Sequence, residues 1–151
     1  MKKIALVLFL LILLSGCDST TPPAPVAADL GTEFTLAPDQ TATITNANLT
    51  MRLISIGGDQ RCPSEIECAI SGPVSLSIAV QRSIDTSVEF DLQTFTSNDG
   101  RAPDGAFDGI EDRIEYQGYL IQVKSVLPYP AKSFDEIKDS EYRVSFLVTK
   151  K

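Results

Sequence analysis

The chain contains no histidine among its 151 residues, and it has only three cysteines. Without histidine, neither a Ser-His-Asp nor a Cys-His catalytic arrangement can be assembled. The glycines form no phosphate-binding loop of the nucleotide-binding type. Paired carboxylates serve glycosidases, but the acidic residues here are abundant and fall mostly on predicted solvent faces. These absences predict a protein that is not an enzyme and that uses no cofactor.

The chain is also short of long hydrophobic runs. Its apolar run at Ile4–Leu14 has 11 residues, whereas a membrane-spanning helix needs about 20. Lys2 and Lys3 precede this run, so residues 1–16 are predicted to be a secretory signal peptide. The following "LLSGC", which ends at Cys17, resembles the lipobox of bacterial lipoproteins. That resemblance implies cleavage before Cys17 and acylation of its sulfur and its new amino group.

Acylation of Cys17 would make the lipid bilayer a partner of the protein. Several acyl chains on one residue give stable anchoring, where a single chain would be marginal. The protein is therefore expected outside the cytoplasm. Asp18 follows the cysteine, and in lipoproteins of double-membraned bacteria an aspartate there often signals retention at the inner membrane, facing the periplasm. In a cell with one membrane, the expected place is the cell surface.

Basic residues are scarce in the mature chain. Beyond the signal peptide, 11 basic residues stand against 20 acidic ones, which argues against a nucleic-acid partner. The stretch "STTPPAPVAADLG" at Ser19–Gly31 is rich in small residues and proline and lacks apolar periodicity. Residues 17–32 are therefore predicted to be a lipidated cysteine with a flexible tether, and residues 33–151 a single folded domain.

Helical periodicity is nearly absent from that domain, whereas apolar and polar residues alternate in about seven segments. The stretch "PVSLSIAVQ" is the clearest case, because every second residue is a large aliphatic one: Val74, Leu76, Ile78 and Val80. A sheet with one apolar face must pack on a second sheet or close on itself. The pattern predicts an all-β, antiparallel β-sandwich of about seven strands, with a small closed β-barrel as the alternative.

Two cysteines, Cys62 and Cys68, stand in "DQRCPSEIECAISG". A structural zinc site needs four nitrogen or sulfur ligands, usually in pairs two to four residues apart, and a redox pair of the thioredoxin type needs Cys-x-x-Cys. Neither condition is met. With Cys17 lipidated, the remaining even pair in an oxidising compartment predicts a disulfide.

The same segment, from Asp59 to Ile78, is similar to a signature of small bacterial lipoproteins and secreted proteins. The shared pattern is Asp-x-Arg-Cys-Pro, then a second cysteine, then a glycine before a strand. The later "YLIQVKSVLPYP", Tyr119–Pro130, also resembles a strand of that family that ends in a proline. The resemblance extends from about residue 34 to residue 150. It implies a compact β domain and no particular activity.

Asp59 and Arg61 flank the first cysteine, and two roles are open to them. They can belong to a recognition loop that the disulfide presents to a partner. Alternatively, they can form a local ion pair that holds the loop in place, and this second role is the preferred one.

The segment at 98–115 interrupts the alternation and holds six acidic residues and three glycines. Asp104, Asp108 and Glu115 follow an approximate EF-hand spacing. Ala106 replaces one ligand position, and no helix pattern flanks the segment. The three acidic residues are kept as candidates for an irregular calcium loop, with a solvated connection between strands as the alternative.

Together these observations predict a membrane-anchored cell-envelope lipoprotein. Its expected role is a non-catalytic binding or scaffolding module for an envelope protein or ligand. A calcium-binding or ligand-sensing domain built on residues 98–115 is the alternative.

Overall fold

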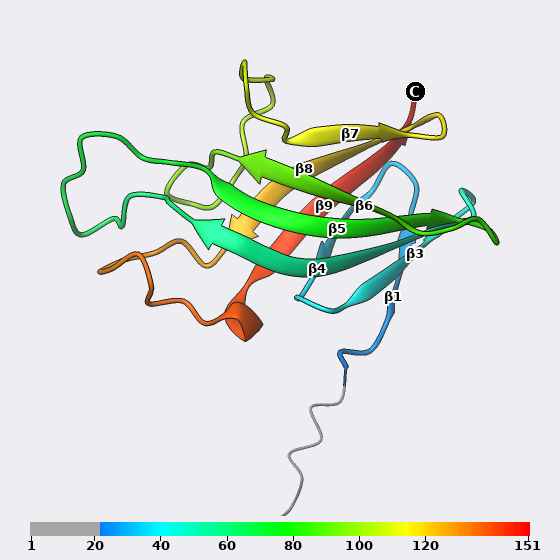
Figure 1. Cartoon of the computed structure of the whole chain (residues 1–151), viewed down its shortest axis with the longest axis horizontal. Helices are drawn as coiled ribbons and strands as arrows, with labels where there is room; N and C mark the ends of the chain where they lie inside the picture. Colours follow the sequence, from blue (N-terminus) through cyan, green and yellow to red (C-terminus); the bar gives the residue numbers. More distant parts are fainter. Residues whose placement is uncertain (1–21) are drawn as a thin grey trace, which may run out of the picture.

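The structure is a computed structural model that describes residues 22–151, so the predicted signal peptide and Cys17 lie outside the described residues. Within that part of the chain, nine strands form two packed sheets (Figure 1). The first sheet has five strands in the order β1-β3-β4-β5-β6, and the second has four in the order β2-β9-β8-β7. The strands are β1 (Val26–Asp29), β2 (Glu33–Leu36), β3 (Thr41–Thr45), β4 (Leu49–Asp59), β5 (Val74–Arg82), β6 (Val88–Thr94), β7 (Arg113–Tyr116), β8 (Tyr119–Leu127) and β9 (Arg143–Lys150).

This architecture confirms the predicted β-sandwich and not the closed barrel, because each sheet keeps two edge strands. All strand pairs are antiparallel except β1 with β3, which are parallel. The expected number of strands was too low. The seven alternating segments correspond to β2–β6, β8 and β9, and the structure adds β1 and β7.

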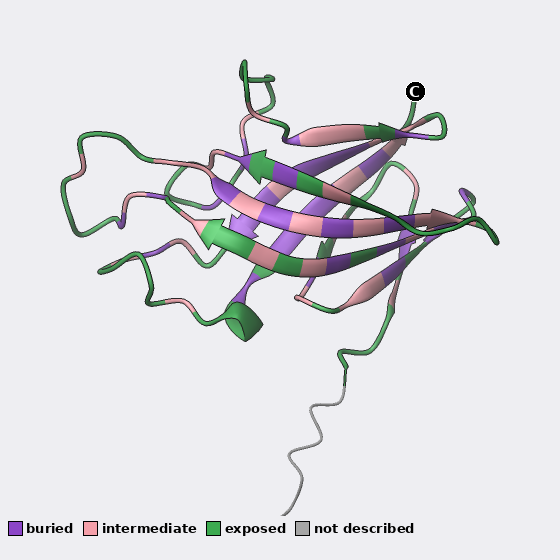
Figure 2. Ribbon diagram, in the orientation of Figure 1, coloured by how far each residue is buried: buried purple, intermediate pink, exposed green. Residues whose placement is uncertain are grey.

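The core lies between the sheets and is built from the alternating aliphatic residues. In β5 the residues alternate between buried and half-buried from Val74 to Gln81 (Figure 2). Its four inward side chains are at most 1% exposed, and full burial of each stabilises the fold by about 1.5–3 kcal/mol. Val144, Phe146 and Val148 of β9 supply the opposite wall of the core.

The tether boundary predicted at residue 32 requires correction. Val26–Asp29 is not part of a tether but an edge strand of the five-stranded sheet, in register with Ala42–Thr45 of β3. The chain then crosses to the other sheet, where β2 pairs with β9. Gly31, at φ 83°, makes this crossing, and its amide donates to the carbonyl of Val148. The folded domain therefore begins before residue 33.

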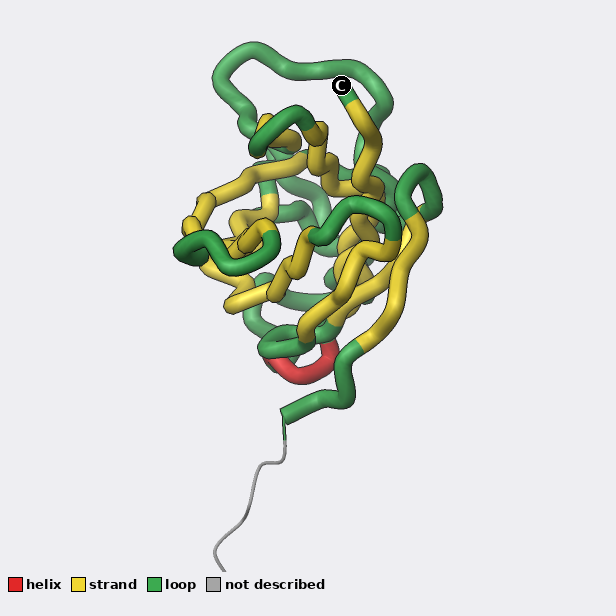
Figure 3. The backbone as a smooth tube through the Cα atoms, turned by 90° about the vertical axis from the view of Figure 1, so that its right-hand side faces the viewer, coloured by secondary structure: helices red, strands yellow, loops and turns green. Residues whose placement is uncertain are grey.

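Three long connections gather at one end of the sandwich: residues 60–73, 95–112 and 128–142 (Figure 1). The last contains a single turn of 3-10 helix, η1 (Asp139–Glu141), which lies beside the first described residues at the base of the molecule (Figure 3). Within residues 22–151 there is no helix with the length and apolar character needed to cross a membrane.

Candidate functional site: the disulfide loop

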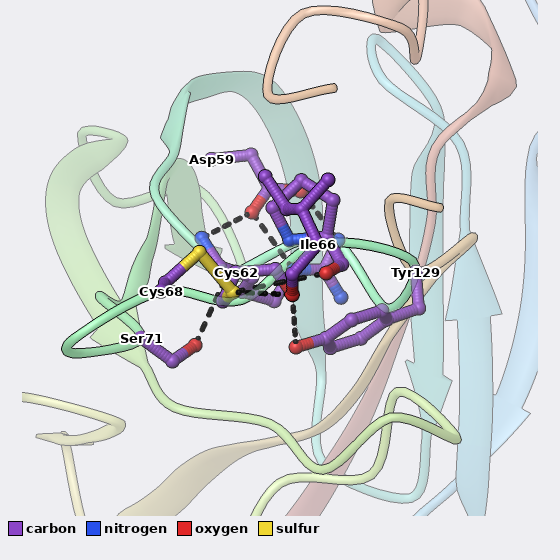
Figure 4. The surroundings of a disulfide bond; sticks show 8 residues. Asp59, Cys62, Ile66, Cys68, Ser71 and Tyr129 are labelled. Carbon is purple, nitrogen blue, oxygen red and sulfur yellow. Dashed lines mark hydrogen bonds and ion pairs between the residues drawn. A yellow bond between two sulfur atoms is a disulfide. The ribbon is translucent and has the colours of Figure 1, made fainter. Parts of the chain in front are cut away.

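The connection from β4 to β5 is closed by a disulfide between Cys62 and Cys68, as the sequence predicts. The Sγ–Sγ distance is 2.11 Å and the two Cα atoms are 5.9 Å apart. Figure 4 shows the bond and its surroundings, and Figure 1 shows the connection extending beyond the ends of β4 and β5. The disulfide holds the two ends of the segment from Cys62 to Cys68 together. We call residues 62–71 the disulfide loop.

Beneath this loop the guanidinium group of Arg61 is completely buried. It forms an ion pair with Asp59, whose side chain is 3% exposed. Arg61 Nε donates to Asp59 Oδ1 at 2.8 Å, and Nη2 donates to Oδ2. The paired contacts make this a bidentate interaction, the strongest geometry available to arginine and carboxylate.

The other donors of Arg61 reach the opposite sheet. Nη1 donates to the carbonyl of Val126 at 2.8 Å, and Nη2 donates to that of Pro128 at 2.9 Å. The aromatic ring of Tyr129 lies against the guanidinium, with its centroid 4.9 Å from Cζ. Arg61 therefore joins the end of β4 to the end of β8, and it fills the space between the sheets at the end where the loops gather.

Asp59 has a third partner in Tyr142, which stands just before β9. The Tyr142 hydroxyl donates to Asp59 Oδ2 at 3.0 Å. Burial of the phenol, together with the negative charge of Asp59, raises the pKa of Tyr142 well above its ordinary value. The hydroxyl consequently stays protonated and keeps its role as a donor to the carboxylate.

The disulfide loop is fastened on the side facing the β8–β9 connection. The amides of Ser64 and Glu65 donate to the carbonyls of Pro130 and Ala131, at 3.0 and 2.8 Å. The Tyr129 hydroxyl donates to the Cys62 carbonyl at 2.9 Å. These hydrogen bonds and the disulfide hold the loop from both sides.

Large aliphatic side chains nevertheless face solvent on this loop. Ile70 is 85% exposed and Ile66 is 42% exposed. Glu65 and Glu67 stand on either side of Ile66 and are exposed as well. The tip of the loop thus combines apolar surface with negative charge.

The structure shows the local ion pair for Asp59 and Arg61. Because both side chains are buried, any recognition by this loop would be carried by its exposed residues, with Arg61 and Asp59 setting its position. Tyr129 and Tyr142 complete the cluster and were missed in the sequence. Each is a single tyrosine beside a strand end, 67 and 83 residues from its partner, and no local pattern links them.

The calcium candidates at residues 104, 108 and 115 are not brought together as a metal site. Asp104 Oδ1 accepts a hydrogen bond from Lys124 Nζ at 2.8 Å, and this contact lowers the pKa of Asp104. Glu115 lies in β7 and pairs with Lys151 at 2.6 Å. Asp108 lies in the exposed part of the connection. Among residues 22–151, no group of three or more His, Cys, Asp or Glu side chains is arranged to hold a metal ion.

The same connection is instead held by ion pairs. Arg113 binds Asp112 through Nε at 2.7 Å, and Arg101 reaches across to Glu33 of β2 at 2.7 Å. Asp112 is only 3% exposed. Two carboxylates of this connection, Asp104 and Asp112, are therefore paired with cations of the chain itself.

Comparison with known proteins adds no identification: no protein family, no curated protein and no solved structure matches the chain. The resemblance of the cysteine segment to a family of small secreted β domains therefore stays a prediction. The same holds for the lipobox at Cys17.

Proposed function

We propose that the protein is a lipid-anchored, extracytoplasmic binding module, and that its disulfide loop docks a protein of the cell envelope. The observation that carries this proposal is Ile70, an aliphatic side chain that is 85% exposed and lies two residues after Cys68 of the disulfide. Single exposed aliphatic residues are common on protein surfaces. What favours a role here is that fixed points stand on both sides of Ile70: the disulfide at Cys68, and Ser71, whose Oγ accepts a hydrogen bond from the Cys62 amide at 3.0 Å.

Rigidity matters because binding costs conformational entropy wherever a loop must be ordered. The disulfide loop is ordered in advance by its disulfide and by hydrogen bonds from Ser64, Glu65 and Tyr129. A partner would therefore meet a preformed surface. Since Glu65 and Glu67 border the apolar tip, the partner surface that fits best has an apolar pocket with basic residues around it.

A non-catalytic role is supported by how the charged side chains are used. The buried Asp59–Arg61 pair is saturated with internal hydrogen bonds, with Tyr142 as a further donor. Asp112, which is only 3% exposed, is paired with Arg113. These groups serve the fold, and general acid–base chemistry needs groups that can reach a substrate.

Chemical cross-linking in intact cells, followed by affinity purification of the full chain, tests the docking loop. Ile70→Glu should abolish the cross-linked product, because a charge replaces the apolar contact. The matched control is Ile84→Glu, at a turn where the isoleucine is 98% exposed. The control should retain the product. Equal yields from the two variants would overturn the role of the loop.

The anchor is tested separately by Cys17→Ser. The variant lacks the sulfur that would be acylated, so the protein should move from the membrane fraction to the soluble fraction of the envelope. A variant that stays in the membrane pellet would contradict anchoring through Cys17.

A further inference from the structure

At the base of the molecule the first described residues border a groove with a volume of about 740 Å³. Pro22 and Pro23 form one side, the connection between β2 and β3 forms another, and η1 with Arg143 closes it. Figure 1 shows the chain leaving the sandwich at this point, and in Figure 3 the same exit lies beside η1. We call this the base groove.

The base groove carries two arginines in a chain that is acidic overall. Arg52, which is 46% exposed, lies 3.7 Å from Asp39 Oδ1, too far for a hydrogen bond. Arg143 is exposed, and within the described residues its contacts are the carbonyls of Ser140 and Tyr142. Both guanidinium groups keep donors that face the groove or solvent.

Two carboxylates line the same groove, Asp39 and Asp139. Both are exposed. The lining is thus balanced in charge, with proline and alanine between the polar groups. A ligand that fits it should carry one anionic group for the arginines and one cationic donor for the aspartates.

The base groove lies close in sequence to Cys17, the proposed site of the lipid anchor, and this position indicates where such a ligand could come from. Cys17 is five residues before Pro22, a reach of at most about 17 Å for extended chain. In an anchored protein the mouth of the base groove is therefore held within a short distance of the lipid headgroups.

We propose that the base groove receives the headgroup of a zwitterionic phospholipid with a primary amine, such as phosphatidylethanolamine. The phosphate would lie between Arg52 and Arg143, and the ammonium group would face Asp39 and Asp139. This inference rests on the anchoring part of the proposed function. It adds an orientation, in which the base of the sandwich rests on the bilayer and the disulfide loop stays free.

The absence of tryptophan from the chain allows a direct test. Ser140→Trp places a unique fluorophore at the exposed rim of the groove, and Ile84→Trp places one at the end of the strands where β3 ends, away from the groove. The mature full-length lipoprotein carrying either change is reconstituted into vesicles of phosphatidylethanolamine and phosphatidylcholine that contain a headgroup spin-labelled quencher. We expect strong quenching at position 140 and little at position 84.

Arg52→Gln and Arg143→Gln, each combined with Ser140→Trp, test the contacts. Each lost charge-assisted contact should lower the occupancy of the docked orientation roughly fivefold, and quenching should fall accordingly. Arg82→Gln, on β5 near the control position, should change nothing. In vesicles of phosphatidylglycerol and phosphatidylcholine, which lack the primary amine, quenching at position 140 should be weaker.

The outcomes separate the two proposals. If the reconstituted chain does not float with the vesicles, anchoring fails and the groove assignment falls with it. If the chain floats but positions 140 and 84 are quenched equally, or if the arginine variants quench like their parent, only the groove assignment is overturned. Stronger quenching on phosphatidylglycerol would overturn the assignment of the headgroup.

Discussion

Replacing Arg61 with methionine should cost the fold about 3–5 kcal/mol, the range measured when one partner of a buried ion pair is removed. Methionine matches the length and much of the volume of the arginine stem. It leaves the Asp59 carboxylate, 3% exposed, with only the Tyr142 hydroxyl and the amide of residue 61 as donors. It also leaves the carbonyls of Val126 and Pro128 without the donors that Arg61 supplies.

The size of this loss is large against the whole stability of a domain, which is typically about 5–15 kcal/mol. Equilibrium unfolding in urea, followed by circular dichroism, measures it as a shift in the transition midpoint at unchanged slope. The matched control is Arg52→Met, because Arg52 pairs with Asp39 at 3.7 Å on the surface. That change should cost less than about 1 kcal/mol.

A double variant checks the cause. If the loss arises from an uncompensated carboxylate, Asp59→Asn combined with Arg61→Met should be less destabilised than the sum of the single changes, with a coupling of about 1–3 kcal/mol. Strict additivity, or an Arg61→Met variant within 1 kcal/mol of the parent protein, would refute the reasoning that this pair holds the two sheets together at the loop end.

Three further predictions concern the same end of the molecule. Tyr142→Phe should cost about 1 kcal/mol at neutral pH, since it removes a donor to Asp59. The raised pKa of Tyr142 means that its contribution is complete below pH 10 and is lost as pH rises, so this variant should show a smaller alkaline loss of stability in pH-dependent urea titrations. Reduction of the Cys62–Cys68 disulfide should cost about 2–2.5 kcal/mol by loop entropy, and the unreduced, unfolded protein should show no free thiol from this pair. Gly100→Ala should destabilise more than Gly109→Ala in thermal unfolding. Both have φ of +79°, but the added Cβ at position 100 would lie 2.5 Å from a leucine side chain, whereas position 109 is open. Equal losses from the two alanine variants would contradict this packing argument.

The alternation of apolar and polar residues predicted most of the strands of the fold. The strands it predicted are those in which a packed face imposes a period of two, as in β5 and β9. The two strands that were missed have four residues each. "VAAD" of β1 offers only small side chains, and its extended conformation is set by pairing with β3, which is a tertiary effect. "RIEY" of β7 lies in an acidic segment whose composition favours a loop.

The local part of the candidate site was predictable, namely the disulfide and the ion pair between Asp59 and Arg61. The cysteine count indicates the disulfide. The burial of Arg61, however, depends on carbonyl groups 65 and 67 residues away, at the end of β8. Which groups contact Arg61 depends on how the two sheets pack. This packing cannot be read from a single sequence. The same limit applies to the base groove, which Arg52 of β4 and Arg143 of β9 line from different sheets.

In the proposed lipid-anchored protein, the edge strand β1 also limits how far the folded domain can lie from the bilayer. Because pairing begins at Val26, at most nine residues separate Cys17 from the sheet, about 30 Å when extended, whereas a tether through residue 32 would have allowed about 55 Å. An anchored domain of this kind can contact only partners that lie within a short distance of its own bilayer. A partner embedded in that bilayer is met at a raised effective concentration, while one attached to a distant envelope layer is out of reach.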